Sequence, residues 1–151
     1  MKKLFIAIAT LLGFATMGAS ASASDIANSV VGVQGYDLVS YQSGAKPLPG
    51  NGNNVVRHKG VNYLFSSAEN KKAFQANPAK YLPAYGGYCA FGVAVGKKFI
   101  GDPTVWDVVD GTLYFNLDNK VKNIWVKDVP GNIVKADTNW TSIRTVAADQ
   151  L

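Results

Sequence analysis

Two tight turns, each lying between short apolar runs, constrain the fold of this chain more than any other feature. The turns are Lys59-Gly60 and Asp110-Gly111. A two-residue turn fixes the pairing register of the flanking strands, and Asp-Gly suits it because both positions need positive φ. The sequence therefore predicts two β-hairpins. Their strands span residues 55–58, 61–65, 105–109 and 112–116.

Each predicted hairpin is followed by residues that start helices. Ser66 and Glu69 have the spacing of a capping box, in which a hydroxyl and a carboxylate each accept a free backbone N–H. Asn77 before Pro78 starts a short helix, and Asp118 caps another. In the two later helices apolar side chains recur at helical spacing: Val121, Ile124 and Trp125 after Asp118, and Ile133, Ala136, Trp140 and Ile143 after Pro130.

A hairpin followed by a helix occurs twice, as a coarse repeat without a fixed period. These elements predict an α+β fold, in which helices pack on a small antiparallel sheet of two hairpins. The predicted core consists of apolar side chains on the inward faces: Phe65, Phe74, Tyr81, Trp106, Val108, Leu113, Phe115, Ile124, Trp125 and Trp140.

The first 23 residues have the pattern of a signal peptide. Lys2 and Lys3 precede an uncharged apolar stretch that ends at Met17, and small residues follow. The apolar run is short for a membrane span, and the small residues favour cleavage. We therefore expect a periplasmic or secreted protein with no membrane insertion after the signal is removed.

Cleavage should leave a mature chain that begins at Ser22 or Ser24, because a small-x-small site precedes each of them. Mass spectrometry of the exported protein measures this directly. An intact Met1 on mature protein would contradict the prediction.

The mature chain would carry few side chains suited to a reactive site. It keeps one cysteine (Cys89), one histidine (His58) and one glutamate (Glu69). A single cysteine excludes an intramolecular disulfide, and one chain cannot build a zinc site from several Cys and His ligands. A Ser-His-Asp triad would have to use His58. The inventory favours a protein that is not an enzyme.

The charge does not favour a nucleic-acid partner. Loss of Lys2 and Lys3 from the 15 basic residues leaves 13 against 10 acidic ones, a net charge of +3. The lysines are spread along the chain, whereas nucleic-acid binding calls for a basic stripe with interleaved aromatic residues.

An uncharged stretch rich in glycine and aromatic residues, 83–96, surrounds Cys89. A thiol there is either a metal ligand, with His58 as the other candidate, or a redox-active group, or a buried small apolar side chain. The rings of Tyr85, Tyr88 and Phe91 either line a small-molecule pocket or fill a core beneath the glycines.

Several segments resemble exported bacterial YHS-domain proteins in their order and spacing. They are YDLVSY at 36–41, YLFSSAENKKAF at 63–74, NPAKYLPAYGGYCA at 77–90, VVDGTLYFN at 108–116 and ADTNW at 136–140. The resemblance divides the chain into a signal peptide (1–23), a lead-in segment (24–35), a YHS-like domain (36–143) and a C-terminal tail (144–151).

The resemblance implies ligand or metal-ion binding, with copper or a similar transition metal as the cofactor. Metal-binding members carry cysteines at a strand-to-helix junction, which here falls on Phe65 and on Ser67 or Glu69. The thiolate ligands are therefore missing at that place, and only Cys89 remains.

The sequence leaves three functions open. The first is a non-catalytic periplasmic YHS-domain protein that binds a ligand or a metal ion. The second is a structural or interaction module without metal, which would act on a protein partner in the periplasm. The third is a thiol-based enzyme that uses Cys89.

Overall fold

The computed structural model describes residues 29–151. The predicted signal peptide, its cleavage sites and residues 24–28 lie outside the described residues. Within 29–151 no helix is long and apolar enough to cross a membrane. The elements, in chain order, are η1 (Gly32–Gly35), η2 (Ser40–Ser43), β1 (Asn51–His58), β2 (Val61–Phe65), α1 (Ala68–Ala76), α2 (Pro78–Tyr81), η3 (Ala84–Gly87), α3 (Ala90–Ala94), β3 (Asp102–Val109), β4 (Thr112–Asn116), α4 (Asn119–Trp125), α5 (Val129–Ile143) and η4 (Ala148–Gln150).

Both predicted hairpins are present, and the α+β class is confirmed. β1 pairs with β2 and β3 pairs with β4, both antiparallel, and they form two separate two-stranded sheets. The turn residues Lys59 and Gly60 have φ values of 48° and 84°, and Asp110 and Gly111 have 50° and 77°. Positive φ at both positions is the geometry that lets a two-residue turn match the twist of its strands.

The helix starts follow the predicted chemistry, with one shift. Asn77 caps α2 and Asp118 caps α4, as predicted. The cap of α1, however, is Ser67, whose hydroxyl accepts from the Asn70 N–H at 3.1 Å. The prediction of Ser66 is wrong because the Ser66 hydroxyl instead donates to the buried carboxylate of Asp37, at 2.6 Å.

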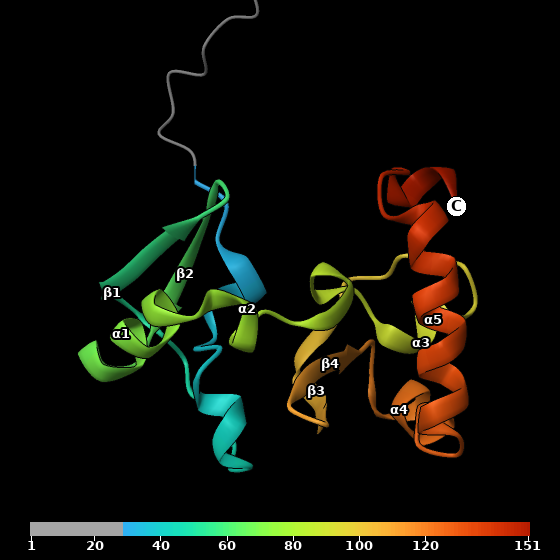
Figure 1. Cartoon of the computed structure of the whole chain (residues 1–151), viewed down its shortest axis with the longest axis horizontal. Helices are drawn as coiled ribbons and strands as arrows, with labels where there is room; N and C mark the ends of the chain where they lie inside the picture. Colours follow the sequence, from blue (N-terminus) through green and yellow to red (C-terminus); the bar gives the residue numbers. More distant parts are fainter. Residues whose placement is uncertain (1–28) are drawn as a thin grey trace, which may run out of the picture.

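The chain is built from two copies of one arrangement, lying side by side (Figure 1). The first repeat (residues 32–81) runs from η1 to α2, and the second repeat (residues 84–143) runs from η3 to α5. Each contains a 3-10 turn, a short helix, a hairpin and two further helices. The expectation of no fixed period is wrong, since equivalent positions stand at a nearly constant offset. Gly35 and Gly87 are 52 residues apart, and Gly60 and Gly111 are 51 apart.

Equivalent hydrogen bonds support the repeat. The Tyr36 N–H donates to the Val33 carbonyl at 3.0 Å, and in the second repeat the Tyr88 N–H donates to the Tyr85 carbonyl at 3.2 Å. Both strand pairs also have an irregularity in register near the start of the longer strand. The two repeats thus share details of hydrogen bonding and strand register that the coarse sequence pattern does not reveal.

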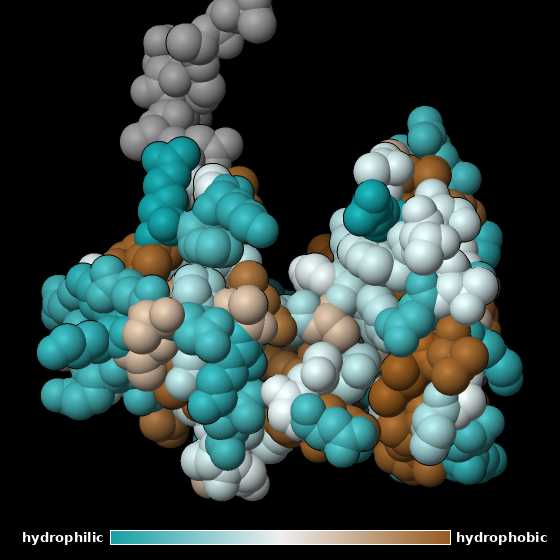
Figure 2. Space-filling model, viewed as in Figure 1, coloured by the Kyte–Doolittle hydropathy of each residue, from teal (hydrophilic) through white to brown (hydrophobic). Residues whose placement is uncertain are grey.

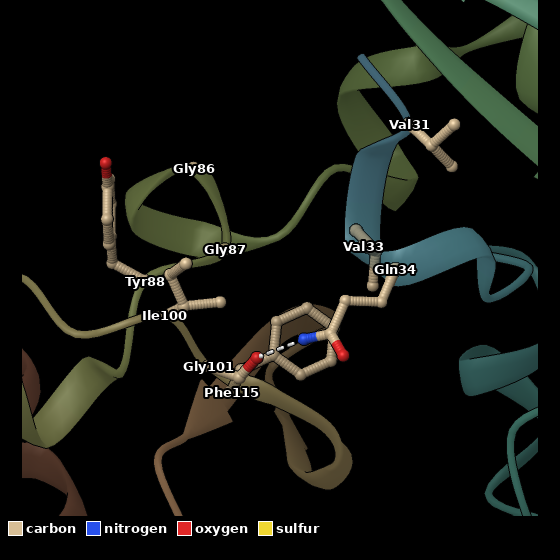
Figure 3. A pocket seen from close by; sticks show the side chains of 9 residues that line it. All are labelled: Val31, Val33, Gln34, Gly86, Gly87, Tyr88, Ile100, Gly101 and Phe115. Atoms are coloured by element: carbon tan, nitrogen blue, oxygen red, sulfur yellow. Dashed lines mark hydrogen bonds between the residues drawn. The ribbon is translucent and has the colours of Figure 1, made fainter. Parts of the chain in front are cut away.

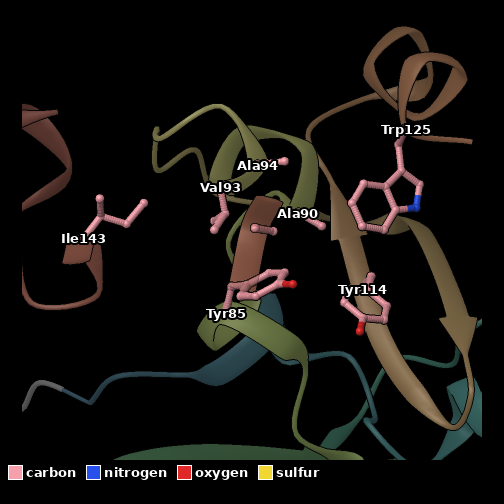
Figure 4. Packing of buried hydrophobic residues seen from close by; sticks show 8 residues of the cluster. Tyr85, Ala90, Val93, Ala94, Tyr114, Trp125 and Ile143 are labelled. Atoms are coloured by element: carbon pink, nitrogen blue, oxygen red, sulfur yellow. The ribbon is translucent and has the colours of Figure 1, made fainter. Parts of the chain in front are cut away.

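The strand β4 lies between two apolar clusters. Leu113 and Phe115 point to one face and join the core of the first repeat. Tyr114 points to the other face, where its ring packs against Trp125 at a centroid distance of 5.6 Å (Figure 4). The first cluster comprises Leu38, Tyr41, Phe65, Phe74, Tyr81, Leu113 and Phe115; the second comprises Tyr85, Ala90, Val93, Ala94, Tyr114, Trp125, Ala136 and Ile143.

Nearly all the predicted core residues are buried or packed against these clusters. Trp106, Val108 and Trp140 are partly buried. The prediction for Ile124 is wrong, because this side chain is 45% exposed. The seven-residue helix α4 turns one narrow face inward, and Trp125 occupies it.

The C-terminal tail is held by Lys98. This buried ammonium donates to the carbonyl oxygens of Arg144, at 3.0 Å, and Val146, at 2.5 Å. It also lies over the rings of Tyr88 and Trp140, 5.2 and 5.5 Å from their centroids. A cation is attracted to an aromatic face, so Lys98 connects the tail with both rings.

Replacement of Phe74 tests the core of the first repeat. Phe74 is fully buried and packs against Phe65 with ring centroids 5.0 Å apart. Phe74→Ala should lower the free energy of unfolding by about 3–5 kcal/mol, measured by urea denaturation. Ile124→Ala is the control, with an expected loss below about 1 kcal/mol. Equal losses in the two variants would contradict the packing.

Candidate ligand-binding groove

A groove lies between the two repeats, and side chains and glycine backbone from both of them line it. It consists of two adjoining cavities of about 300 Å³ and about 390 Å³. Val31, Val33 and Gly86 line both cavities and so join them. Figure 2 shows the molecule hollowed between its two halves. We call this feature the inter-repeat groove, with the smaller cavity as its inner part and the larger cavity as its outer part.

The inner part is lined by apolar side chains and by glycine backbone. In Figure 3 Val33 and Gln34 approach from the first repeat, and Gly86 and Gly87 approach from the second. Its lining residues are Val31, Val33, Gln34, Gly86, Gly87, Tyr88, Ile100, Gly101 and Phe115. A concave, mostly apolar surface with a small number of polar groups is the usual form of a small-molecule site.

Left-handed turns bring the backbone to the groove from both sides. Val33 and Gln34 in η1 have φ values of 50° and 51°, and Tyr85 and Gly86 in η3 have 53° and 65°. A β-branched residue such as Val33 is rare in this conformation. Because both repeats contain the turn, it is a property of the repeat. The two turns bring Val33, Gln34 and Gly86 to the lining of the groove.

A hydrogen bond joins the repeats beside the inner part. The Gln34 side-chain amide donates to the Gly101 carbonyl at 3.2 Å (Figure 3). A second link is buried nearby in the fold, where the Tyr41 hydroxyl donates to the Pro103 carbonyl at 2.8 Å. These bonds and the shared core around Leu113 and Phe115 fix one repeat against the other, so the groove is preformed.

The outer part carries the only basic side chains among the lining residues of either cavity. These are His58, at the end of β1, and Lys59, in the turn that follows. The His58 ring is edge-on to Phe74, with centroids 6.0 Å apart. No aspartate or glutamate lines either cavity in the described part of the chain.

Of the three aromatic residues predicted to line a pocket, the structure places one in the groove. Tyr88 lines the inner part. Tyr85 belongs to the core, and its hydroxyl donates to the Asp137 carboxylate at 2.9 Å. Phe91 packs against the same core from outside. Gly86 and Gly87, beside Tyr88, therefore face a cavity, while the rings of Tyr85 and Phe91 are used in the core.

Cys89 and His58 occupy different halves of the molecule. His58 ends β1 in the first repeat, and Cys89 precedes α3 in the second (Figure 1). Within residues 29–151 there is no group of three or more His, Cys, Asp or Glu side chains able to hold a metal ion. The structure thus places these two candidate ligands on elements of different repeats.

The Cys89 thiol has a structural position. It is fully buried and caps α3, where Sγ accepts the Gly92 N–H at 3.3 Å. The residue 52 positions earlier is Asp37, a buried carboxylate that accepts the Val39 N–H at 2.9 Å and the Ser66 N–H at 2.8 Å. Both side chains thus accept backbone N–H groups after the same turn. Burial raises the pKa of the Cys89 thiol, which favours its neutral form.

Sequence reasoning missed the contribution of the lead-in segment. The Val30 carbonyl accepts the Asn62 N–H at 2.8 Å, which places this segment beside β2, and Val31, Val33 and Gln34 then line the groove. A signal was present, because Gly35-Tyr36 recurs as Gly87-Tyr88 at the repeat offset.

Comparison of the chain with protein-family models, with curated proteins and with solved structures finds no match.

Burial predicts slow chemistry at Cys89. Because the thiol is enclosed and its pKa is raised, a maleimide should label it slowly in the native protein at neutral pH and rapidly in urea. Mass spectrometry of timed samples measures the two rates. Equal rates in the folded and unfolded protein would show that the thiol is accessible.

Proposed function

We propose that this protein is an exported, non-catalytic binding protein of the YHS type. It holds a small, largely apolar molecule in the inter-repeat groove. The observation that carries the proposal is the preformed, mostly apolar groove to which both repeats contribute. The pattern of residues 1–23 supports export, and the YHS-like segments support the family.

The surroundings of Cys89 favour binding over catalysis. A nucleophilic thiol needs access and a base within hydrogen-bonding reach. Cys89 is instead enclosed, its sulfur accepts a backbone N–H, and the Asn116 amide oxygen lies 3.8 Å away. The same enclosure separates the thiol from a metal ion in solution, so we place ligand binding in the groove and not at Cys89.

Binding of an uncharged fluorophore tests the proposal. N-phenyl-1-naphthylamine emits more strongly in apolar surroundings, so the wild-type protein should give a saturable rise in emission with one molecule bound. Gly86→Asn should weaken binding roughly tenfold, about 1.4 kcal/mol, because the new side chain would enter the groove.

Gly96→Asn is a matched control for this variant. Gly86 and Gly96 have φ values of +65° and +76°, and an added Cβ would meet no atom within 4 Å at either site. Asparagine tolerates this conformation, so the backbone effect should be similar in both. Of these two glycines, Gly86 lines the groove and Gly96 does not. Absence of saturable binding by the wild type, or equal weakening by the two variants, would refute the proposed function.

A further inference from the structure

The two parts of the inter-repeat groove differ in charge. The inner part is lined only by uncharged residues, among them Val33, Ile100 and Phe115. The outer part has Lys59 and His58 on its wall, with no acidic residue among its lining. A low-dielectric groove with a cation at one end attracts a molecule that has an apolar body and an anionic end.

The requirements of the turn do not explain the lysine at position 59. Lys59 has φ 48°, in a position where Asn, Asp and Gly are favoured. The equivalent residue of the second repeat is Asp110, with φ 50°. The two turns have the same backbone shape and opposite charges, and the lysine belongs to the turn that borders the groove.

Lys59 is also free to meet a ligand. Its side chain is exposed, and within residues 29–151 the one ion pair joins other residues, Lys122 and Asp107. Its ammonium therefore does not have to leave a carboxylate of the described chain in order to bind an anion.

We infer that the ligand is a single-chain amphipathic anion. This inference rests on the proposed function, in which the groove is the binding site. Its apolar chain lies in the inner part, past Val33 and Gly86, and its anionic head lies at Lys59 in the outer part. Two sources share this chemistry: a free fatty acid, whose head is a carboxylate, and a single-chain phosphorylated lipid.

Calorimetric titration tests the inference with three probes of one chain length: decanoate, decyl phosphate and uncharged 1-decanol. All are used below the concentrations at which they aggregate. The wild-type protein should bind at least one of the anions more tightly than decanol. The anion that binds more tightly identifies the head group and therefore the source.

Lys59→Gln should lower the affinity for that anion, relative to decanol, roughly three- to fivefold, the upper part of the range for an exposed ion pair. Lys72→Gln is the control, since it removes an exposed lysine on α1 that does not line the groove. Its ratio of anion to decanol affinity should equal that of the wild type.

The outcomes separate this inference from the proposed function. If decanol binds as tightly as both anions, or if Lys59→Gln leaves the affinity ratio unchanged, the anionic ligand is refuted while an apolar site remains. If Gly86→Asn has no effect on any probe, the groove itself is refuted as the binding site.

Discussion

Burial of β4 on both faces is the constraint on which the rest of the structure depends. Its residues 113–116 are all buried, although the strand belongs to a sheet of only two strands. Leu113 and Phe115 complete the core of the first repeat, and Tyr114 lies in the core of the second. One short strand thus serves as the wall between the repeats. The inter-repeat groove exists because this wall holds them at a fixed separation.

The repeats have diverged at equivalent positions while keeping their backbone. Asp37 and Cys89 both accept backbone N–H groups after a left-handed turn, one with a carboxylate and the other with a thiol. Lys59 and Asp110 occupy the same place in the two hairpin turns with opposite charges. The first difference leaves a structural role unchanged. The second places a cation at one end of the groove.

Much of the fold could be predicted because its signals are local. The turns at Lys59-Gly60 and Asp110-Gly111 and the caps at Asn77 and Asp118 depend on the chemistry of a few neighbouring residues. The shift of the α1 cap from Ser66 to Ser67 could not be predicted in this way. It depends on Asp37, 29 residues away along the chain from Ser66, which takes the Ser66 hydroxyl.

The groove could not be predicted from the sequence, because it too depends on contacts between residues far apart along the chain. Val31 and Val33 meet Gly86 only after both repeats have packed on β4. The aromatic residues near Cys89 indicated a pocket, but the sequence could not show which rings would face a cavity. Only Tyr88 does, since Tyr85 and Phe91 are used in packing.

The shared strand also sets the order in which the chain can fold. A chain that emerges N-terminus first presents Leu38, Tyr41 and Phe65 before Leu113 and Phe115 have been released to cover them. The first repeat therefore cannot complete its core until these residues are available, and they come about fifty positions after its hairpin. Apolar surface that stays open for that interval can bind chaperones or aggregate. The core of the first repeat is consequently closed only when the second hairpin is in place.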